Sequence, residues 1–206
     1  MDLNPAEFDQ IAREVFAPVY PVIADQIKNK TCITKGICLD IGGGSGYLGI
    51  ALAKVTELHV YLFDKSPEML EIAARNIAAS GLDSKIQTLP GDVRNIPFDD
   101  QSIDLVVSRG SIFFWENRPK AFKEIYRVLS PGGCAYIGGG FGTPELQKQI
   151  TEKMLKNNKD WLEMVKRNTG KHNEETFKEE LCSAGIPRFE IIRNEKGLWI
   201  FIRRVN

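Results

Sequence analysis

The sequence has 206 residues, 43% of them hydrophobic and 26% charged, which suits one globular domain. Its 27 basic and 27 acidic residues cancel, so bulk charge attracts neither nucleic acid nor an anionic membrane. No apolar run is long enough to span a membrane, and the first residues do not resemble a signal peptide. We therefore expect a cytoplasmic protein without a nucleic-acid or membrane partner.

The N-terminal segment 1–30 predicts a helical cap. Asn4-Pro5-Ala6-Glu7 combines a capping residue with Glu at the third helical position. One face of the helix then carries Phe8, Ile11, Ala12 and Val15. We expect Pro18 and Pro21 to break it.

Strands and helices then alternate. Five short apolar runs predict buried strands, at residues 37–41, 60–63, 86–89, 103–107 and 134–137. Between them, Ser66-Pro67 begins one helix and Ser130-Pro131-Gly132 ends another. This alternation predicts a parallel sheet with right-handed crossovers and helices on both faces.

The remaining segment differs from this pattern. Residues 141–185 predict a helical insert that begins at Thr143-Pro144 and ends with a helix capped by Asn173. The apolar runs at 189–192 and 198–202 predict a hairpin.

The cysteines and histidines predict no metal site. The four cysteines are Cys32, Cys38, Cys134 and Cys182, and their spacing fits neither a zinc site nor a disulfide framework. We interpret them as reduced thiols. His59 and His172 lie far apart in the sequence.

The stretch from Asp40 to Gly49 can be aligned with two glycine motifs. Gly44-x-Gly46-x-x-Gly49 matches a dinucleotide fingerprint, but the strand ends near Asp40, so Gly44 comes late. A carboxylate at Asp40 would also repel a pyrophosphate.

The second alignment is Asp40-x-Gly42-x-Gly44-x-Gly46, and it suits a ligand with a cationic group, such as S-adenosylmethionine. Asp40 can hold its ammonium; the alternative is that Asp40 merely caps the following turn.

Two further acids end predicted strands. Asp64 lies 18 residues after Gly46, where one carboxylate can accept from both ribose hydroxyls. Asp92 follows the third strand and can accept from an adenine amino group. Both would lie along the carboxyl edge of the sheet.

Together these stretches resemble the class I S-adenosylmethionine-dependent methyltransferases, in the type 11 subgroup of small-molecule enzymes. The resemblance covers about residues 35–140, including 63–70, 91–98, 113–116 and 127–133. It implies a Rossmann-like α/β fold, a doubly wound seven-stranded sheet that is mostly parallel with an antiparallel C-terminal strand. We expect one domain, 1–206, with a cap (1–30), a cofactor-binding core (35–140), a lid (141–185) and a hairpin (186–206).

The resemblance also implies the positions of the cofactor. The methionine part should be surrounded by Asp40, Gly42, Gly44 and Gly46. The ribose and adenine should be bound by Asp64, Lys65, Met69, Asp92 and Val93. The main chain at Ser108 and Arg109 should face the methionine ammonium. Aromatic residues of the cap should close the site, with Phe8 and Tyr20 as candidates. For Met69 and Tyr20 ordinary packing is the alternative.

Methyl transfer is an in-line displacement that requires mainly positioning and exclusion of water. Glu116, Tyr136 and His172 are possible bases, and we assign none. Ser108-Arg109-Gly110-Ser111 stands where nucleic-acid and protein-amide enzymes of this family often have Asn-Pro-Pro-Tyr, so we expect a small organic acceptor.

Arg109 either pairs an acidic group on that acceptor or forms a surface salt bridge. The predicted function is thus transfer of a methyl group to a small molecule, with S-adenosylhomocysteine as product. The alternatives are a nicotinamide-dependent oxidoreductase and a non-catalytic S-adenosylmethionine-binding protein. Oligomeric state stays open.

Overall fold

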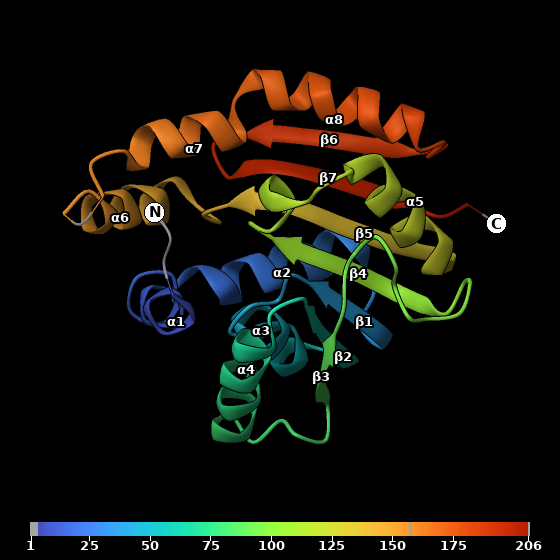
Figure 1. Ribbon diagram of the computed structural model, residues 1–206, viewed down its shortest axis with the longest axis horizontal. Helices are drawn as coiled ribbons and strands as arrows, with labels where there is room; N and C mark the ends of the chain where they lie inside the picture. Colours follow the sequence, from blue (N-terminus) through green and yellow to red (C-terminus); the bar gives the residue numbers. More distant parts are fainter. Residues whose placement is uncertain (1–3, 157, 206) are drawn as a thin grey trace.

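A single seven-stranded sheet organises the molecule (Figure 1). The computed structural model describes residues 4–156 and 158–205. The strands are β1 (Lys35–Ile41), β2 (Glu57–Asp64), β3 (Ile86–Pro90), β4 (Ile103–Arg109), β5 (Leu129–Gly140), β6 (Phe189–Asn194) and β7 (Gly197–Arg203). The helices are α1 (Pro5–Glu14), α2 (Val19–Thr31), α3 (Tyr47–Val55), α4 (Pro67–Ala79), the 3-10 turn η1 (Ile112–Phe114), α5 (Arg118–Val128), α6 (Pro144–Met154), α7 (Trp161–Thr169) and α8 (Lys171–Ser183).

The strand order is β3-β2-β1-β4-β5-β7-β6. Strands β1 to β5 pair in parallel, and β7 runs antiparallel to both β5 and β6. The order reverses at β1, which lies between β2 and β4 and so forms the topological switch point of the sheet. The predicted mostly parallel sheet with an antiparallel C-terminal strand is confirmed.

Two apolar cores lie on the two faces of the sheet. Successive residues of β1 point to opposite faces, so Cys38 packs with α2 and α3 while Leu39 packs with α5 and α8. Trp161 of α7 joins the first core. In Figure 1, α1, α6 and α7 gather at the end of the sheet toward which β4 and β5 point. This arrangement leaves the carboxyl ends of the parallel strands covered by helices.

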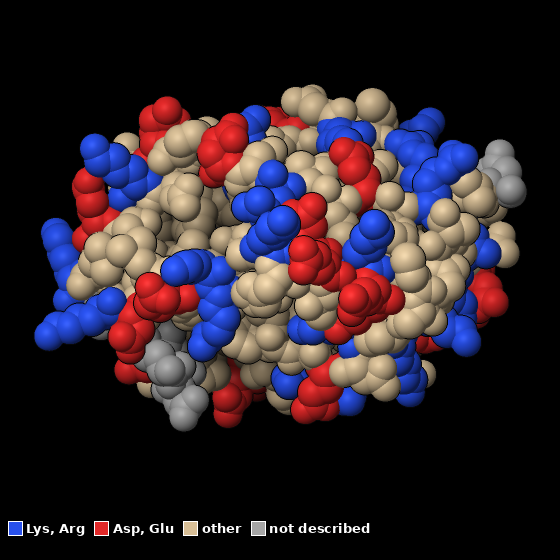
Figure 2. Space-filling view, turned by 90° about the horizontal axis from the view of Figure 1, so that it is seen from above, with Lys and Arg blue, Asp and Glu red and all other residues tan. Residues whose placement is uncertain are grey.

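Neither a one-sided charge distribution on the face seen in Figure 2 nor a membrane-spanning helix in the described ranges is found. In Figure 2 the basic and acidic side chains are interspersed over the visible face. No helix in the described ranges is both long and apolar enough to cross a bilayer. Within the same ranges, no cluster of His, Cys, Asp and Glu could hold a metal ion.

The structure corrects three details of the predicted elements. Pro21 does not break a helix, because it lies in the first turn of α2, where its missing N–H is not needed. Asn173 does not cap α8; its side chain donates instead to the carbonyls of Arg167 and Asn168 at the end of α7. Ser130-Pro131-Gly132 belongs to β5, which begins directly after α5 ends at Val128.

Gly49 lets helix α3 lie close to the sheet. It is buried in that helix, and an added Cβ would come within 2.5 Å of Leu62 Cδ2 and 3.1 Å of Val60 Cγ1. Leu62 is fully buried, so it has little room to move away. The absence of a side chain at Gly49 is therefore required by the close packing of α3 on β2.

We expect Gly49→Ala to lower the free energy of unfolding by about 1–3 kcal/mol, because overpacking outweighs the better helix propensity of alanine. Urea unfolding measures this. The matched control is Lys54→Ala, an exposed position on the same helix, which should change stability by less than about 0.5 kcal/mol. Equal stabilities for the two variants would contradict the packing argument.

Candidate functional site

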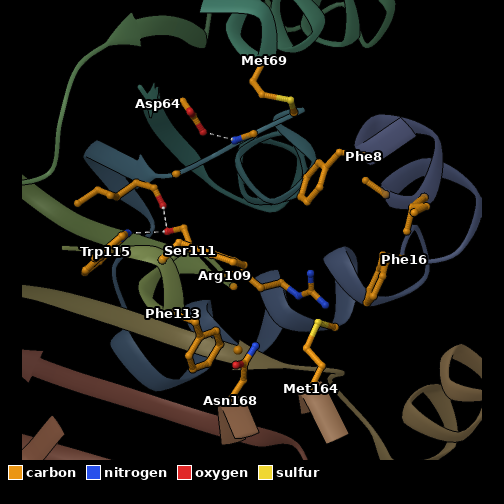
Figure 3. Close-up of a pocket in the computed structure, with 18 of the residues that line it drawn as sticks. Phe8, Phe16, Asp64, Met69, Arg109, Ser111, Phe113, Trp115, Met164 and Asn168 are labelled. Carbon is orange, nitrogen blue, oxygen red and sulfur yellow. Dashed lines mark hydrogen bonds between the residues drawn. The ribbon is translucent and has the colours of Figure 1, made fainter. Parts of the chain in front are cut away.

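A cavity of about 1080 Å³ lies at the carboxyl ends of the parallel strands (Figure 3). Its walls combine the segments that follow β1, β2, β3 and β4 with side chains of α1, α6 and α7. Ligands of open α/β folds bind at this edge, close to the switch point of the strand order. The cavity therefore lies where the sequence predicts a cofactor.

Gly42 begins the glycine loop and makes room for the protein itself. Its φ is +64°, and an added Cβ would come within 2.3 Å of Ser111 Cβ. Ser111 Oγ donates to the Ile41 carbonyl at 3.0 Å and accepts from Trp115 Nε1 at 3.1 Å. Gly42 lines the cavity, but its missing side chain primarily allows Ser111 to fix the loop.

Asp40 is buried beneath the same loop. Its exposed fraction is 1%, and Oδ2 accepts from the Gly49 main-chain N–H at 3.0 Å. This bond caps the first turn of α3, as the alternative interpretation of Asp40 predicted. Burial, partly offset by the Gly49 hydrogen bond, raises the pKa of Asp40 to about 7. Asp40 also borders a small recess beside the main cavity, next to Tyr20 and Arg109.

Asp64 connects the tip of β2 to the loop. One oxygen accepts from Gly44 N at 3.0 Å and the other from Ser66 N at 2.9 Å. Each carboxylate oxygen retains a further lone pair, and Asp64 lines the cavity. Figure 3 shows it with Met69 and Phe8 on one side of the opening.

Asp92 forms a bidentate pair with Arg94. Arg94 Nη2 lies 2.7 Å from Asp92 Oδ2, and its Nε donates to Oδ1 at 2.9 Å. These bonds lower the pKa of Asp92 to about 2. Asp92 lines the cavity beside Lys65 and Val93, so this corner carries the predicted Lys65 and a second cation, Arg94, that the sequence did not connect to it.

Nine of the twelve predicted cofactor residues line the main cavity. They are Tyr20, Gly42, Gly44, Asp64, Lys65, Met69, Asp92, Val93 and Arg109. The other three lie behind it. Gly46 packs against Leu62 and Ala73, Ser108 Oγ lies 2.7 Å from Ser111 Oγ, and Asp40 borders only the recess. These three can act by holding the loop rather than by direct contact.

The candidate bases lie in different places. Tyr136 packs on Trp199 and His172 is exposed on α8, and neither lines the cavity. Glu116 lies at the rim, 76% exposed and paired with Arg94 at 2.9 Å. The cavity wall thus offers no buried acid or base positioned for proton transfer among the three candidates.

The aromatic character of the cavity was largely missed from the sequence. Its wall includes Phe16, Phe113, Phe114, Phe141 and Trp161. The predicted lid supplies α7, but helical spacing alone could not show which side chains turn inward. Residues from α1 and α7 meet here only because the sheet brings both helices to one edge.

Comparison with known proteins identifies the family. A family model described as a methyltransferase domain matches residues 39–137. The Bacillus subtilis protein named uncharacterized methyltransferase YdaC is 30% identical over 133 residues, which cover 62% of this chain and 71% of that protein. A solved Methanococcus maripaludis structure, assigned to the S-adenosyl-L-methionine-dependent methyltransferases, is 45% identical, with a TM-score of 0.96 over 100% of this chain and 98% of that one. The chain belongs to the class I S-adenosylmethionine-dependent methyltransferases.

Two further relatives match this chain over only part of their length. Demethylmenaquinone methyltransferase of Chlorobaculum tepidum is 38% identical over 99 residues, and rice 2-methyl-6-phytyl-1,4-hydroquinone methyltransferase 1 is 35% identical over 102 residues. These matches cover 48% and 49% of this chain but only 38% and 30% of those proteins. The [4+2]-cyclase SpnF shares the fold at a TM-score of 0.54 and 24% identity, over 57% of this chain and 44% of that one. The fold is therefore compatible with other chemistry.

The buried Asp40 predicts an unusual pH dependence of this protein's stability. The pKa of Asp40 is raised in the folded state, so folding takes up a proton between about pH 4 and pH 7. The free energy of unfolding therefore falls as pH rises through that window. Asp40→Asn removes the charge and keeps an oxygen for Gly49. We expect the ligand-free variant to gain on the order of 1 kcal/mol relative to the wild type between pH 5 and pH 8, measured by urea unfolding.

The control is Asp83→Asn, an exposed carboxyl outside the cavity, which should leave the pH dependence of unfolding unchanged. If Asp40→Asn followed the wild-type pH profile, Asp40 would not titrate as described.

Proposed function

We propose that this protein transfers the methyl group of S-adenosylmethionine to a small, largely apolar acceptor and releases S-adenosylhomocysteine. The observation that carries the proposal is the hydrogen bond from Gly44 of the glycine loop to Asp64. This bond lies at the edge of a cavity large enough for the cofactor and the acceptor together. Family membership favours this function over a nicotinamide oxidoreductase.

The polar and apolar residues around Asp64 and the glycine loop match the chemical groups of S-adenosylmethionine. Asp64 has lone pairs left for ribose hydroxyls, and the Asp40 carboxylate borders a recess that would suit an ammonium group. Met69, which is 8% exposed, and Val93 offer apolar contacts for an adenine.

The chain's own contribution to the reaction is positioning. When bound, S-adenosylmethionine supplies an activated methyl group with a neutral sulfide as its leaving group. The loop and Asp64 hold the cofactor in one orientation, while α1, α6 and α7 restrict access of water. An acceptor that is anionic or a neutral amine at the reacting atom needs no protein base, which agrees with the absence of one among the candidates.

The lining of the cavity supports an apolar acceptor body. Phe16 and Phe113 turn their rings toward the cavity, and Met164 adds a flexible thioether (Figure 3). Trp161 lines the same cavity. Two relatives are named for quinone and hydroquinone substrates, which are small molecules with apolar rings. The expectations of a cytoplasmic location, no nucleic-acid partner and one four-part domain stay predictions from sequence.

Asp64→Ala should weaken cofactor binding and reduce methyl transfer. We expect S-adenosylhomocysteine affinity to fall by at least about 10-fold, because charge-assisted hydrogen bonds to ribose and to the loop are lost together. Calorimetry measures the affinity. Transfer of labelled methyl into a small-molecule extract should fall in parallel.

The matched control is Asp83→Ala, which removes an exposed carboxyl outside the cavity and should leave affinity and transfer unchanged. Wild-type binding of S-adenosylhomocysteine without any labelled product in extracts of many sources would favour the non-catalytic alternative.

A further inference from the structure

Arg109 carries a charge inside an aromatic part of the cavity. It ends β4, and its Nε and Nη2 both donate to the Gly140 carbonyl, at 3.2 and 3.0 Å. Its Cζ lies 4.8 Å from the centre of the Phe16 ring and 5.4 Å from that of Tyr20. Figure 3 shows the guanidinium extending into the cavity toward Met164.

Among the residues that the structure describes, no acidic side chain pairs with Arg109. None of the salt bridges found in residues 4–156 and 158–205 includes it. Its second terminal nitrogen, Nη1, has no hydrogen-bond partner in those same ranges. A guanidinium stays charged, and one carbonyl with two ring faces replaces only part of its hydration. The surface salt bridge considered from the sequence is therefore wrong, and an anion entering the cavity would be stabilised at this position.

A second unused donor lies in the same wall. Trp161 of α7 is 6% exposed and lines the cavity, and its indole N–H has no partner in the described part of the chain. Its ring centre lies 6.0 Å from that of Phe16, the ring that Arg109 also faces. Asn168 extends from the same helix into the cavity (Figure 3). The partly buried Arg109 and the buried Trp161 thus flank one aromatic ring.

We propose that the methyl acceptor carries a carboxylate and that the Arg109 side chain binds it, with Trp161 as a second donor. A monoanion matches the charge of this guanidinium. Of the other cations in the lining, Lys65 and Arg167 are exposed and Arg94 is paired with Asp92, so a doubly charged phosphate would meet no second unpaired and partly buried cation among the described lining residues. The apolar body of the acceptor then lies against Phe16 and Trp161. The inference rests on the proposed function and specifies its substrate class.

A rival assignment gives the Arg109 side chain to the carboxylate of the cofactor, since Arg109 also borders the recess beside Asp40. The position of the guanidinium favours the acceptor, because it stacks on Phe16 of the cap and extends toward α7, away from Asp64 (Figure 3). Only the main chain of Arg109 is then left for the cofactor.

The test is a calorimetric titration of the full chain saturated with S-adenosylhomocysteine. The probes are aryl and alkyl carboxylates, such as 3-phenylpropanoate, each paired with its neutral amide. We expect wild-type protein to prefer carboxylates by about 10-fold or more, and Arg109→Gln to remove the preference. Arg109→Lys, which keeps the charge, should retain part of it, and Trp161→Phe should weaken it severalfold.

A panel in which no carboxylate binds the wild type better than its amide would overturn the inference. So would an Arg109→Gln variant that loses S-adenosylhomocysteine affinity but binds methylthioadenosine, which lacks the amino-acid part, as the wild type does. That result would assign Arg109 to the cofactor. Failure of the wild type to bind S-adenosylhomocysteine at all would instead overturn the proposed function.

Discussion

The site depends on how two carboxylates hold one glycine loop. Asp40 accepts the Gly49 N–H from below, and Asp64 accepts the Gly44 N–H from the neighbouring strand. Because β1 and β2 pair in parallel up to Ile41 and Phe63, both acids arrive at the same sheet edge. The loop is thereby fixed before any ligand enters, which is the preorganisation that a positioning enzyme requires. This role in holding the loop also explains why Asp40 is buried although burial raises its pKa.

The cavity beyond the loop has two chemically different ends. Asp64 and Asp92 lie at the end suited to a nucleoside. Arg109, with the rings of Phe16 and Tyr20 beside it, lies at the other end. The methyl group would be transferred between these ends, under helices contributed by both the start and the last third of the chain. Under the proposed function, specificity for the acceptor belongs to α1, Phe16 and α7, while cofactor binding belongs to the strand tips.

Local patterns predicted what depends on nearby residues. Short motifs predict where the parallel strands end, which alignment of the glycine loop with Asp40 applies, and the hairpin at the end of the sheet. Tertiary contacts decided the rest. Gly42 is small because Ser111, 69 positions later, occupies its side-chain space. The sequence could not show that Arg109 has no acidic partner among the described residues, because that depends on which elements surround β4.

The central claim is that Asp40, Asp64 and the glycine loop between them select S-adenosylmethionine over a dinucleotide. The most direct measurement is calorimetric titration of the wild-type protein with S-adenosylhomocysteine and, separately, with NAD. We predict saturable one-to-one binding of S-adenosylhomocysteine and no measurable binding of NAD at the same concentrations. Tighter binding of NAD would contradict the account.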